Sequence, residues 1–377
     1  MPSVIDSDQH LYEPRGMWAD HIDPALRDDA LELVDDDRGF TWVSWRGAAL
    51  ELADVHLPGN TKSNGDHRRR LRAGERSSYI YDAVLPATYW NPSARVEWLD
   101  TVGLDEAVCF PNFGLLWERR LSSSLRALTG NMAAWNRYCA SIVTDSGGRL
   151  HPVAHLTLRH GDWLVDQLAQ LDAAGVRLAM IAPAPVDGRA MSAPEHERLW
   201  AAFVEHGVTP VFHVADQPRM FADCWYPSDD QSFVPAIESA FLWVPPAIAL
   251  TDLILSGVFD RHPELRVGIV ELSSIWVPQF MLMLDGAVDF TSRLNGNDVT
   301  LRKRPSDYLL DHVRVSSFSY EDPARLTRKT GDIYMCCSDY PHSEGTDTPL
   351  ADYDRAGCEP SQQQGLFNSN VELLLGR

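Results

Sequence analysis

Short runs of apolar and β-branched residues alternate along the chain with longer segments in which apolar residues recur at i, i+3 and i+4. The short runs are typical of buried strands, and the longer segments, such as DWLVDQLAQLDAAG and PEHERLWAAFVEHG, are typical of amphipathic helices. Strands that alternate with helices indicate a parallel sheet built from βα units. The strands are predicted at residues 4–10, 105–111, 151–158, 175–183, 208–214, 265–272, 312–320 and 332–342.

Eight strand–helix pairs in succession predict an α/β fold in which residues 1–377 form one (β/α)8 TIM barrel. An open, doubly wound sheet is the alternative. However, no G-x-G-x-x-G follows the first predicted strand, and the sequence contains no phosphate-binding loop motif, so the usual parts of a nucleotide site are missing. A barrel would place its reactive groups at the C-terminal ends of the strands.

Residues 12–90 do not follow the repeat, and we interpret them as an insertion after the first strand that covers the barrel mouth. They contain the basic run HRRRLRAGER at residues 67–76, which could hold an anionic substrate, although solvated charge or pairing with acidic neighbours is the favoured interpretation. Residues 222–235 form a second long loop, after the fifth predicted strand. A loop of this length near a barrel mouth is often functional.

The charge balance limits the classes of partner. The chain has 33 Lys plus Arg against 53 Asp plus Glu, a formal net charge of −20. Such an acidic chain repels phosphate backbones, which excludes nucleic acid and anionic membrane surfaces as general partners. No apolar run approaches the roughly 18–20 residues that span a bilayer, and the first ten residues do not resemble a secretory signal.

The six cysteines show no disulfide or metal-binding spacing, so a reducing cytoplasm is the expected compartment. Adjacent Cys336 and Cys337 are interpreted as packing thiols, with a redox pair as the alternative.

Residues that can bind a metal fall at the ends of predicted strands. Asp8 and His10 lie at i and i+2 of the first strand and therefore point to one face, while His213 ends the fifth strand and Asp339 the eighth. Each could be an ordinary capping group. Together, at strand ends that converge in a barrel, they predict a site of two nitrogen and two oxygen ligands.

Four segments carry a family resemblance: DSDQHLYEP at the start, PVFH in the fifth strand, ELSSIWVP after the sixth and SDYPHSEG at the eighth. Over essentially the whole chain, the sequence resembles the amidohydrolase-related, metal-dependent barrel hydrolases, and most closely the group similar to aminocarboxymuconate-semialdehyde decarboxylase. The resemblance implies metal ligands at Asp8, His10, His213 and Asp339, with Glu13 as a further candidate. Many relatives have H-x-H, and some E-x-H, where this chain has Asp8 and His10.

The resemblance also implies catalytic roles. The aspartate that matches Asp339 would touch the metal and accept a proton from water or substrate. His342 would bind the substrate or cap its loop. Decarboxylases of the family usually have a histidine where this chain has Glu271, and an ionised glutamate would repel a substrate carboxylate unless it is protonated or paired. Glu271 could instead bind the metal, orient a water or bind a hydroxyl or amine.

The lysine count bears on the number of metal ions. Two-metal members of the wider superfamily commonly bridge their ions with a carboxylated lysine on the fourth strand, but this chain has no lysine between Lys62 and Lys303. One divalent ion is therefore expected. Zinc, manganese and iron all accept such a mixed ligand set.

The first functional hypothesis is a mononuclear metal-dependent hydrolase, in which activated water attacks a C–N, C–O or C–C bond of a small cyclic or aromatic substrate. The alternatives are a non-oxidative decarboxylase of an aromatic or unsaturated acid, and a metal-free binding barrel. The expected partner is a small-molecule substrate, and the expected assembly is a homodimer. The residues expected to bind the substrate are Trp90, Asn112, Phe113 and His155.

Overall fold

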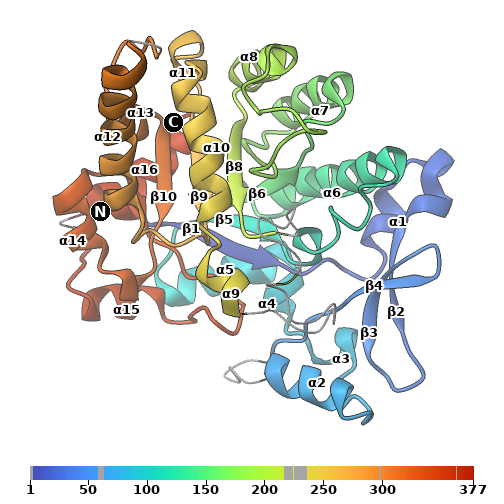
Figure 1. The fold of residues 1–377 in the computed structure, drawn as a ribbon. Coiled ribbons are helices and arrows are strands. Elements are labelled where there is room, and N and C mark those ends of the chain that lie inside the picture. Colours follow the sequence, from blue (N-terminus) through green and yellow to red (C-terminus); the bar gives the residue numbers. More distant parts are fainter. Residues whose placement is uncertain (1–2, 58–62, 216–223, 225–235, 297–298, 362) are drawn as a thin grey trace.

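The structure is a computed structural model that describes residues 3–57, 63–215, 224, 236–296, 299–361 and 363–377. Eight parallel strands form one sheet in the order β1-β5-β6-β7-β8-β9-β10-β11 (Figure 1). They are β1 (Ile5–Leu11), β5 (Glu106–Pro111), β6 (Leu150–His155), β7 (Leu178–Met180), β8 (Thr209–His213), β9 (Val267–Val270), β10 (Val313–Ser316) and β11 (Tyr334–Met335). Each overlaps a predicted strand, and β1 and β6 extend one residue beyond the predicted bounds, so the predicted barrel is confirmed.

The sheet closes where the first strand meets the chain that follows the last. β11 is only two residues long, so the seam depends on backbone hydrogen bonds beyond its end. Asp339 N donates to Asp8 O at 2.8 Å, and His10 N donates to Tyr340 O at 2.8 Å. These bonds place two predicted ligands, Asp8 and Asp339, on adjacent strands although 330 residues of chain separate them.

Helices surround the barrel (Figure 1). None of the described helices is both long enough and apolar enough to cross a bilayer. The helices are α5 (Pro92–Val102), α6 (Leu125–Asp145), α7 (Gly161–Ala173), α8 (Glu197–Glu205), α9 (Ala236–Ala240), α10 (Val244–Leu255), α11 (Val258–Arg261), α12 (Val277–Asn295), α13 (Pro305–His312), α14 (Pro323–Thr330), α15 (Pro349–Arg355) and α16 (Asn370–Leu374).

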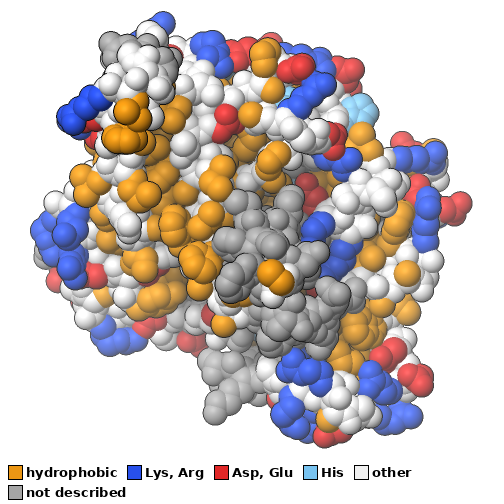
Figure 2. Space-filling model, in the orientation of Figure 1, with side chains coloured by type: hydrophobic (Ala, Val, Ile, Leu, Met, Phe, Trp, Pro, Cys, Tyr) orange, Lys and Arg blue, Asp and Glu red, His pale blue; other side chains and the backbone are white. Residues whose placement is uncertain are grey.

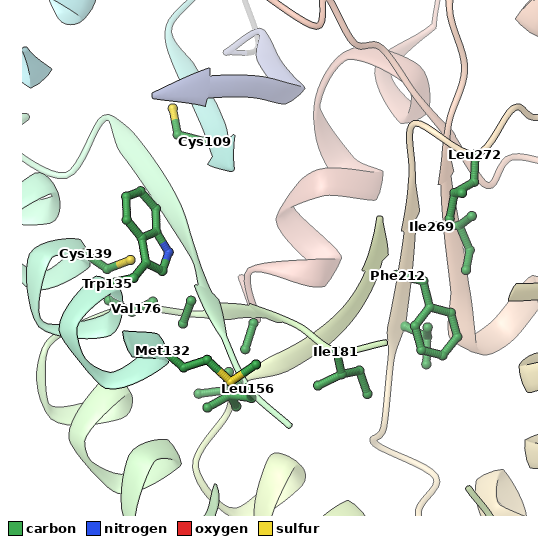
Figure 3. Packing of buried hydrophobic residues seen from close by; sticks show 14 of the residues in the cluster. Cys109, Met132, Trp135, Cys139, Leu156, Val176, Ile181, Phe212, Ile269 and Leu272 are labelled. Carbon is green, nitrogen blue, oxygen red and sulfur yellow. The ribbon is translucent and has the colours of Figure 1, made fainter. Parts of the chain in front are cut away.

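The alternation of side chains along each strand divides the core into two layers. Outward residues such as Phe212 and Ile269 pack in the layer between the sheet and the helices, which also holds Trp135 of α6 (Figure 3). Inward residues fill the barrel together with the C-terminal helix α16: they are Ile5, Val108, Phe110, Leu115, Val153, Leu178, Met180, Val211, Val270, Met335, Val371, Leu374 and Leu375. The lumen is therefore packed, and polar inward positions occur toward the strand ends.

A different set of elements lies between β1 and β5. Three antiparallel strands form a second sheet in the order β2-β3-β4, seen at the lower right of Figure 1. Its elements and neighbours are α1 (Met17–His21), the 3-10 helix η1 (Pro24–Asp29), β2 (Leu31–Asp35), β3 (Thr41–Trp45), β4 (Ala48–Leu52), α2 (Ser63–Arg72), α3 (Tyr81–Val84) and α4 (Ala87–Trp90). That residues 12–90 form a distinct cap over the mouth stays a prediction.

Acidic side chains pair with the basic run on α2. Arg68 Nη2 lies 2.6 Å from Asp54 Oδ1, and Arg70 Nε lies 2.9 Å from Asp66 Oδ2. This pairing supports the interpretation favoured from the sequence. Apart from Cys224, the long loop predicted at residues 222–235 lies outside the described residues. Cys336 and Cys337 are both buried and unpaired with each other, as packing thiols are.

Candidate metal centre

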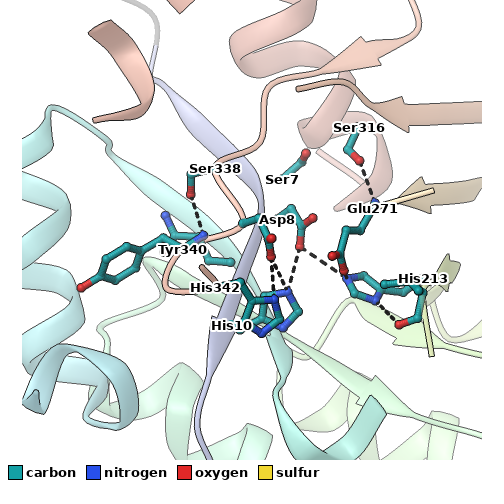
Figure 4. A network of polar contacts seen from close by, with 12 residues as sticks. Ser7, Asp8, His10, His213, Glu271, Ser316, Ser338, Tyr340 and His342 are labelled. Atoms are coloured by element: carbon teal, nitrogen blue, oxygen red, sulfur yellow. Dashed lines mark hydrogen bonds and ion pairs between the residues drawn. The ribbon is translucent and has the colours of Figure 1, made fainter. Parts of the chain in front are cut away.

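Six ionisable side chains from four strand ends meet at the barrel mouth (Figure 4). Their potential ligand atoms form two overlapping groups, and within each group the atoms lie within 4.8 Å of one another. One group contains Asp8, His10, His213 and Glu271, and the other contains His10, Glu271, Asp339 and His342. The structure thus brings together all four residues predicted as ligands, with the two additional residues predicted to be catalytic.

The distances place imidazole nitrogens between carboxylates. His10 Nε2 lies 3.1 Å from Asp339 Oδ1 and 3.5 Å from Asp8 Oδ1. On the other side of Asp8, His213 Nε2 lies 3.5 Å from the same oxygen and 3.3 Å from Glu271 Oε2. The side chains of Asp8, His10, His213 and Asp339 are fully buried. Water therefore contributes little to solvating these charges.

Backbone carbonyls fix which nitrogen of each histidine faces the centre. His10 Nδ1 lies 3.2 Å from Pro111 O, and His213 Nδ1 lies 2.7 Å from Val214 O. A carbonyl oxygen can only accept, so Nδ1–H donates in both cases and a neutral ring presents the lone pair of Nε2 to the carboxylates. Metal-binding histidines are commonly oriented in this way.

The atoms that face one another lack ordinary hydrogen bonds. Among the described residues, both carboxylate oxygens of Asp8 and of Asp339, Glu271 Oε2 and His10 Nε2 are buried without a hydrogen-bond partner. Buried polar atoms in folded proteins are almost always satisfied, and such exceptions point to an ion or a catalytic role. The donor set of carboxylate oxygens and imidazole nitrogens fits a divalent transition metal.

The electrostatics lead to the same requirement for positive charge. Burial alone would lower the pKa of His10, but Asp339 and Asp8 outweigh it and raise that pKa to about 10. Burial would likewise raise the pKa of Asp339, yet His342 and His10 hold it below its usual range. Burial raises the pKa of Glu271 well above the usual range, and the charges of Asp339 and Asp8 add to the effect. The two aspartates are therefore the charged carboxylates, and they need a proton on His10 or a cation between them.

Left-handed backbone aims two of the carboxylates. Ile269 points outward from β9, so regular alternation along a strand would also point Glu271 outward. The backbone instead turns at this residue, because φ is +54° at Glu271, and φ is likewise +56° at Asp339. Such a conformation costs a non-glycine residue about 1 kcal/mol or more and is typical of functional sites. The turn after Asp339 requires Gly345, because a Cβ there would lie 2.5 Å from Asp339 O.

A buried network behind β1 supports the first two ligands, and the sequence reasoning missed it. Asp6 Oδ1 accepts from Asp8 N and from Ser338 N, both at 3.0 Å, which ties β1 to the eighth strand. Arg95 of α5 is fully buried and donates to Gln9 Oε1 at 2.9 Å and to His10 O at 2.8 Å. Burial raises the pKa of Asp6 to about 6 despite these bonds. Nothing in the local sequence of α5 indicated that Arg95 would be buried.

His342 belongs to a second cluster that reaches into the segment between β1 and β5. Its Nδ1 lies 2.9 Å from Asp339 Oδ1, and its Nε2 lies 2.9 Å from Asn112 Oδ1. Its ring stacks on His10 at a centroid distance of 3.7 Å and meets His56 edge-on at 5.5 Å. His56, which is buried and bonded to the Tyr12 hydroxyl, was not a predicted site residue.

The structure places the remaining predicted site residues differently from the central six. Glu13 lies outside both ligand groups: its two oxygens accept from Phe113 N at 3.0 Å and Gly114 N at 2.8 Å, so it caps a turn, and metal binding by Glu13 stays a prediction. Phe113 is fully buried beside Tyr12, whereas Trp90 is 39% exposed.

His155 lies at the end of β6, on the same face as inward-pointing Val153. Its Nε2 lies 3.1 Å from Glu118 Oε2, so it forms a separate pair at the mouth. Of the four predicted substrate-binding residues, Asn112 is the one bonded to the central cluster. Substrate binding by all four stays a prediction.

Comparison with known proteins assigns the family. The family model described as Amidohydrolase matches residues 126–377, about two thirds of the chain. The chain belongs to the amidohydrolase family. This confirms the resemblance seen in the sequence, and the match includes β8, β9 and the segment after β11 that carry four of the six central residues. No curated protein matches the amidohydrolase sequence significantly.

Solved structures share the fold over the full length of this amidohydrolase. An amidohydrolase from Mycobacterium avium subsp. paratuberculosis K-10 is 22% identical, with a TM-score of 0.78 and coverage of 100% of this chain and 99% of that chain. A 5-carboxyvanillate decarboxylase from Novosphingobium aromaticivorans, complexed with manganese, is 15% identical, with a TM-score of 0.61 and coverage of 100% and 96%. A 2,6-dihydroxybenzoate decarboxylase from Rhizobium is 14% identical, with a TM-score of 0.60 and coverage of 100% and 99%. At these identities the likeness establishes the fold.

Proposed function

We propose that this amidohydrolase is a mononuclear metal-dependent hydrolase that adds water across a C–N, C–O or C–C bond of a small cyclic or aromatic substrate. The observation that carries the proposal is the buried cluster at the mouth, in which the oxygens of Asp8 and Asp339 face His10 Nε2 without hydrogen bonds. Such buried charges need either a proton on His10 or a cation between them, and the set of carboxylate oxygens and imidazole nitrogens favours the cation.

The ligands would be Asp8, His10, His213 and Asp339, with Glu271 close enough to join them. A divalent ion, when bound, supplies a Lewis acid that lowers the pKa of a coordinated water to about 7. Zinc, manganese and iron each suit this set. The manganese in the Novosphingobium decarboxylase supports the choice of a divalent ion and leaves its identity to measurement.

Two carboxyl groups would divide the proton transfers. Asp339 remains ionised, so it can accept a proton from water, and His342 at 2.9 Å from its Oδ1 can pass that proton onward. Without the ion, burial and the charges of Asp339 and Asp8 raise the pKa of Glu271 well above its usual range. A Glu271 that stays outside the ligand set would keep its proton and donate it to a leaving group. Pairs of carboxyl groups with pKa values driven apart are the usual acid and base of such sites.

The test is a screen of the metal-loaded chain against cyclic amides, lactones and hydroxylated aromatic acids, with product mass as the readout. Hydrolysis predicts products whose summed mass exceeds that of the substrate by one water, which for a cyclic amide or lactone is a single ring-opened product. Glu271→Gln and Asp339→Asn should sharply lower turnover, whereas Glu106→Gln, at the first residue of β5 and therefore at the opposite end of the barrel, is the matched control that should retain it. Release of CO2 without addition of water would contradict hydrolysis.

A second candidate is non-oxidative decarboxylation of an aromatic or unsaturated acid. The raised pKa of Glu271 favours it, because a protonated carboxyl can donate a hydrogen bond to a substrate carboxylate instead of repelling it. The decarboxylases among the structural neighbours add support at the level of the fold. In the same screen this activity would appear as CO2 with a product lighter by that mass.

Metal analysis separates both enzymes from a metal-free binding barrel. We expect one divalent ion per chain in the purified protein, and loss of that ion in the His213→Ala variant. A wild-type chain that stays folded and takes up no divalent metal would leave the binding barrel as the function and would contradict both enzyme proposals.

A further inference from the structure

Helix α12 carries large hydrophobic side chains on its outer surface. Leu282 is 76% exposed, Met283 60%, Phe290 62% and Leu294 66%. Isolated exposed hydrophobic residues are normal, but a contiguous group of this kind on one helix marks an interaction site. In the space-filling view, hydrophobic side chains gather over α10 and α12 (Figure 2).

The exposed residues of α12 follow one helical face. The exposed residues that recur at i, i+3, i+4 and i+7 are Gln279, Leu282, Met283, Gly286, Ala287, Phe290, Arg293 and Leu294, and exposed Asp289 borders this face beside Leu282. The opposite face, with Val277, Phe280 and Leu284, is buried against the barrel. The helix is therefore hydrophobic on two faces, and the fold of one chain buries only one of them.

Gly286 lies at the centre of the exposed face and is an independent sign of a partner. Glycine is a poor helix former, so a glycine in the middle of a 19-residue helix needs a reason. A Cβ at this position would meet nothing within 4 Å, so packing within the chain supplies none. A second helix that crosses here at close range would supply it, since small residues allow backbones to approach.

We propose that a second copy of this chain covers this face, with the two α12 helices antiparallel about a twofold axis at Gly286. The sequence of the helix is complementary to itself in that arrangement. Leu282 and Phe290 lie four residues on either side of Gly286, so Leu282 packs against the partner subunit's Phe290. Gln279 and Arg293 lie seven residues on either side, and the Arg293 guanidinium donates to the partner subunit's Gln279. Self-complementary patches of this kind characterise twofold dimers.

The dimensions suit a dimer. At 1.5 Å per residue, α12 is about 28 Å long. Residue Ile248 of the neighbouring helix α10 is 53% exposed, so α10 and α12 together form a surface two helices wide. Treated as flat, this surface has an area on the order of 600 Å², and the protruding side chains add to it. Stable interfaces bury about 600–1,000 Å² per partner, so this face is at the lower end of that range. The net charge of −20 makes an anionic membrane a poor alternative partner for the same face.

The first test measures the mass of the full chain in solution by sedimentation equilibrium. The wild type is expected near twice 42.2 kDa. Leu282→Glu and Phe290→Glu should each raise the dissociation constant at least about 30-fold, as loss of a central interface residue does. Gly286→Leu should act in the same direction without a charge, while the circular dichroism spectrum stays that of the wild type. Ile80→Glu, at an equally exposed hydrophobic residue between α2 and α3, is the matched control and should leave the dimer intact.

The second test examines the register by oxidative cross-linking, with the wild type as the background. Gly286→Cys lies on the proposed axis and should form a disulfide-linked dimer, whereas Leu294→Cys is eight residues away, so its two copies lie about 24 Å apart and should not. A monomeric wild type, dimers that survive Leu282→Glu and Phe290→Glu, or cross-linking through Leu294→Cys alone would each overturn the proposal. A monomer that binds phospholipid vesicles through this face would overturn it as well.

Discussion

At the mouth of the barrel, the oxygens of Asp8 and Asp339 lie 2.9–3.5 Å from imidazole nitrogens without hydrogen bonds, whereas at the base Glu106 is paired with two cationic partners. Glu106 Oε2 lies 2.5 Å from His151 Nε2 and 2.7 Å from Arg377 Nη2. Burial would raise the pKa of Glu106, but these two partners outweigh it and lower the pKa to about 2. At the mouth, by contrast, the pKa of Glu271 is raised well above its usual range, so the two ends shift the pKa of a glutamate in opposite directions.

This difference separates function from stability along one molecule. In a TIM barrel, the C-terminal ends of the strands carry the chemistry and the N-terminal ends carry stability. At the mouth, the carboxylates of Asp8 and Asp339 repel each other, and a bound cation would offset this repulsion. At the base, the ion pairs of Glu106 with His151 and Arg377 stabilise the folded chain. Substitutions at the mouth should therefore change activity and metal dependence, and substitutions at the base should change stability alone.

The largest effect is expected for Asp339→Asn at the mouth. It removes a ligand and the proton acceptor, so turnover should fall by about 10³-fold, within the range for loss of a general base. Steady-state kinetics of the metal-loaded variant, with its metal content measured in parallel, check this. Turnover within a few-fold of the wild type would show that Asp339 has a structural role instead.

Metal removal should have the next largest effect. At free metal about 100 times the dissociation constant, binding stabilises the folded state by about 3 kcal/mol, and a chelator should abolish this gain. Thermal unfolding with and without chelator measures the shift. Glu106→Gln, at the base, serves as control because it should show the same shift as the wild type. Equal melting temperatures with and without chelator would contradict the proposed site.

Glu106→Gln itself should lower the free energy of unfolding by about 2 kcal/mol at pH 7, less than the ~3 kcal/mol that its lowered pKa implies, because the pair is partly exposed. The folded pKa lies below the unfolded value of 4.5, so this stability is present above pH 4.5 and is lost as the pH falls through about 2. Urea unfolding of both proteins over this range should show the difference shrinking with acidity. Activity at pH 7 should be unchanged, and a loss of activity would break the separation between the two ends.

The smallest effect is expected for Glu271→Gln in the metal-free chain, which should be more stable than the metal-free wild type by about 1 kcal/mol at pH 7. The pKa of Glu271 is higher in the folded state, so the wild type must take up a proton on folding at neutral pH, and glutamine avoids this cost. The gain should vanish below about pH 4.5, where the carboxyl is protonated in both states. Destabilisation at pH 7 in urea would show that Glu271 is ionised and paired.

The barrel could be predicted because each strand–helix repeat is a local pattern, and the ligands could be predicted because strand ends converge in such a fold. The turn that Glu13 caps could not be predicted, since its distance from His10 in sequence does not reveal the hydrogen bond from Phe113 N. Arg95 and His56 could not be found, because their importance depends on contacts with β1 and His342 that follow from tertiary packing. Likewise, the strand–helix repeat predicts a helix after the sixth strand, where α12 lies, but not that two of its faces are hydrophobic.

The seam of the barrel has a consequence for how the protein is made. Asp8 and His10 leave the ribosome early, whereas Asp339 is synthesised more than 300 residues later and joins them through the bond from Asp339 N to Asp8 O. A nascent chain can therefore hold only part of the ligand set until its last strand is complete. Binding of the metal by the complete ligand set would therefore follow the last step of folding. The bound ion would link the first strand, through Asp8 and His10, to the segment after the last strand, through Asp339.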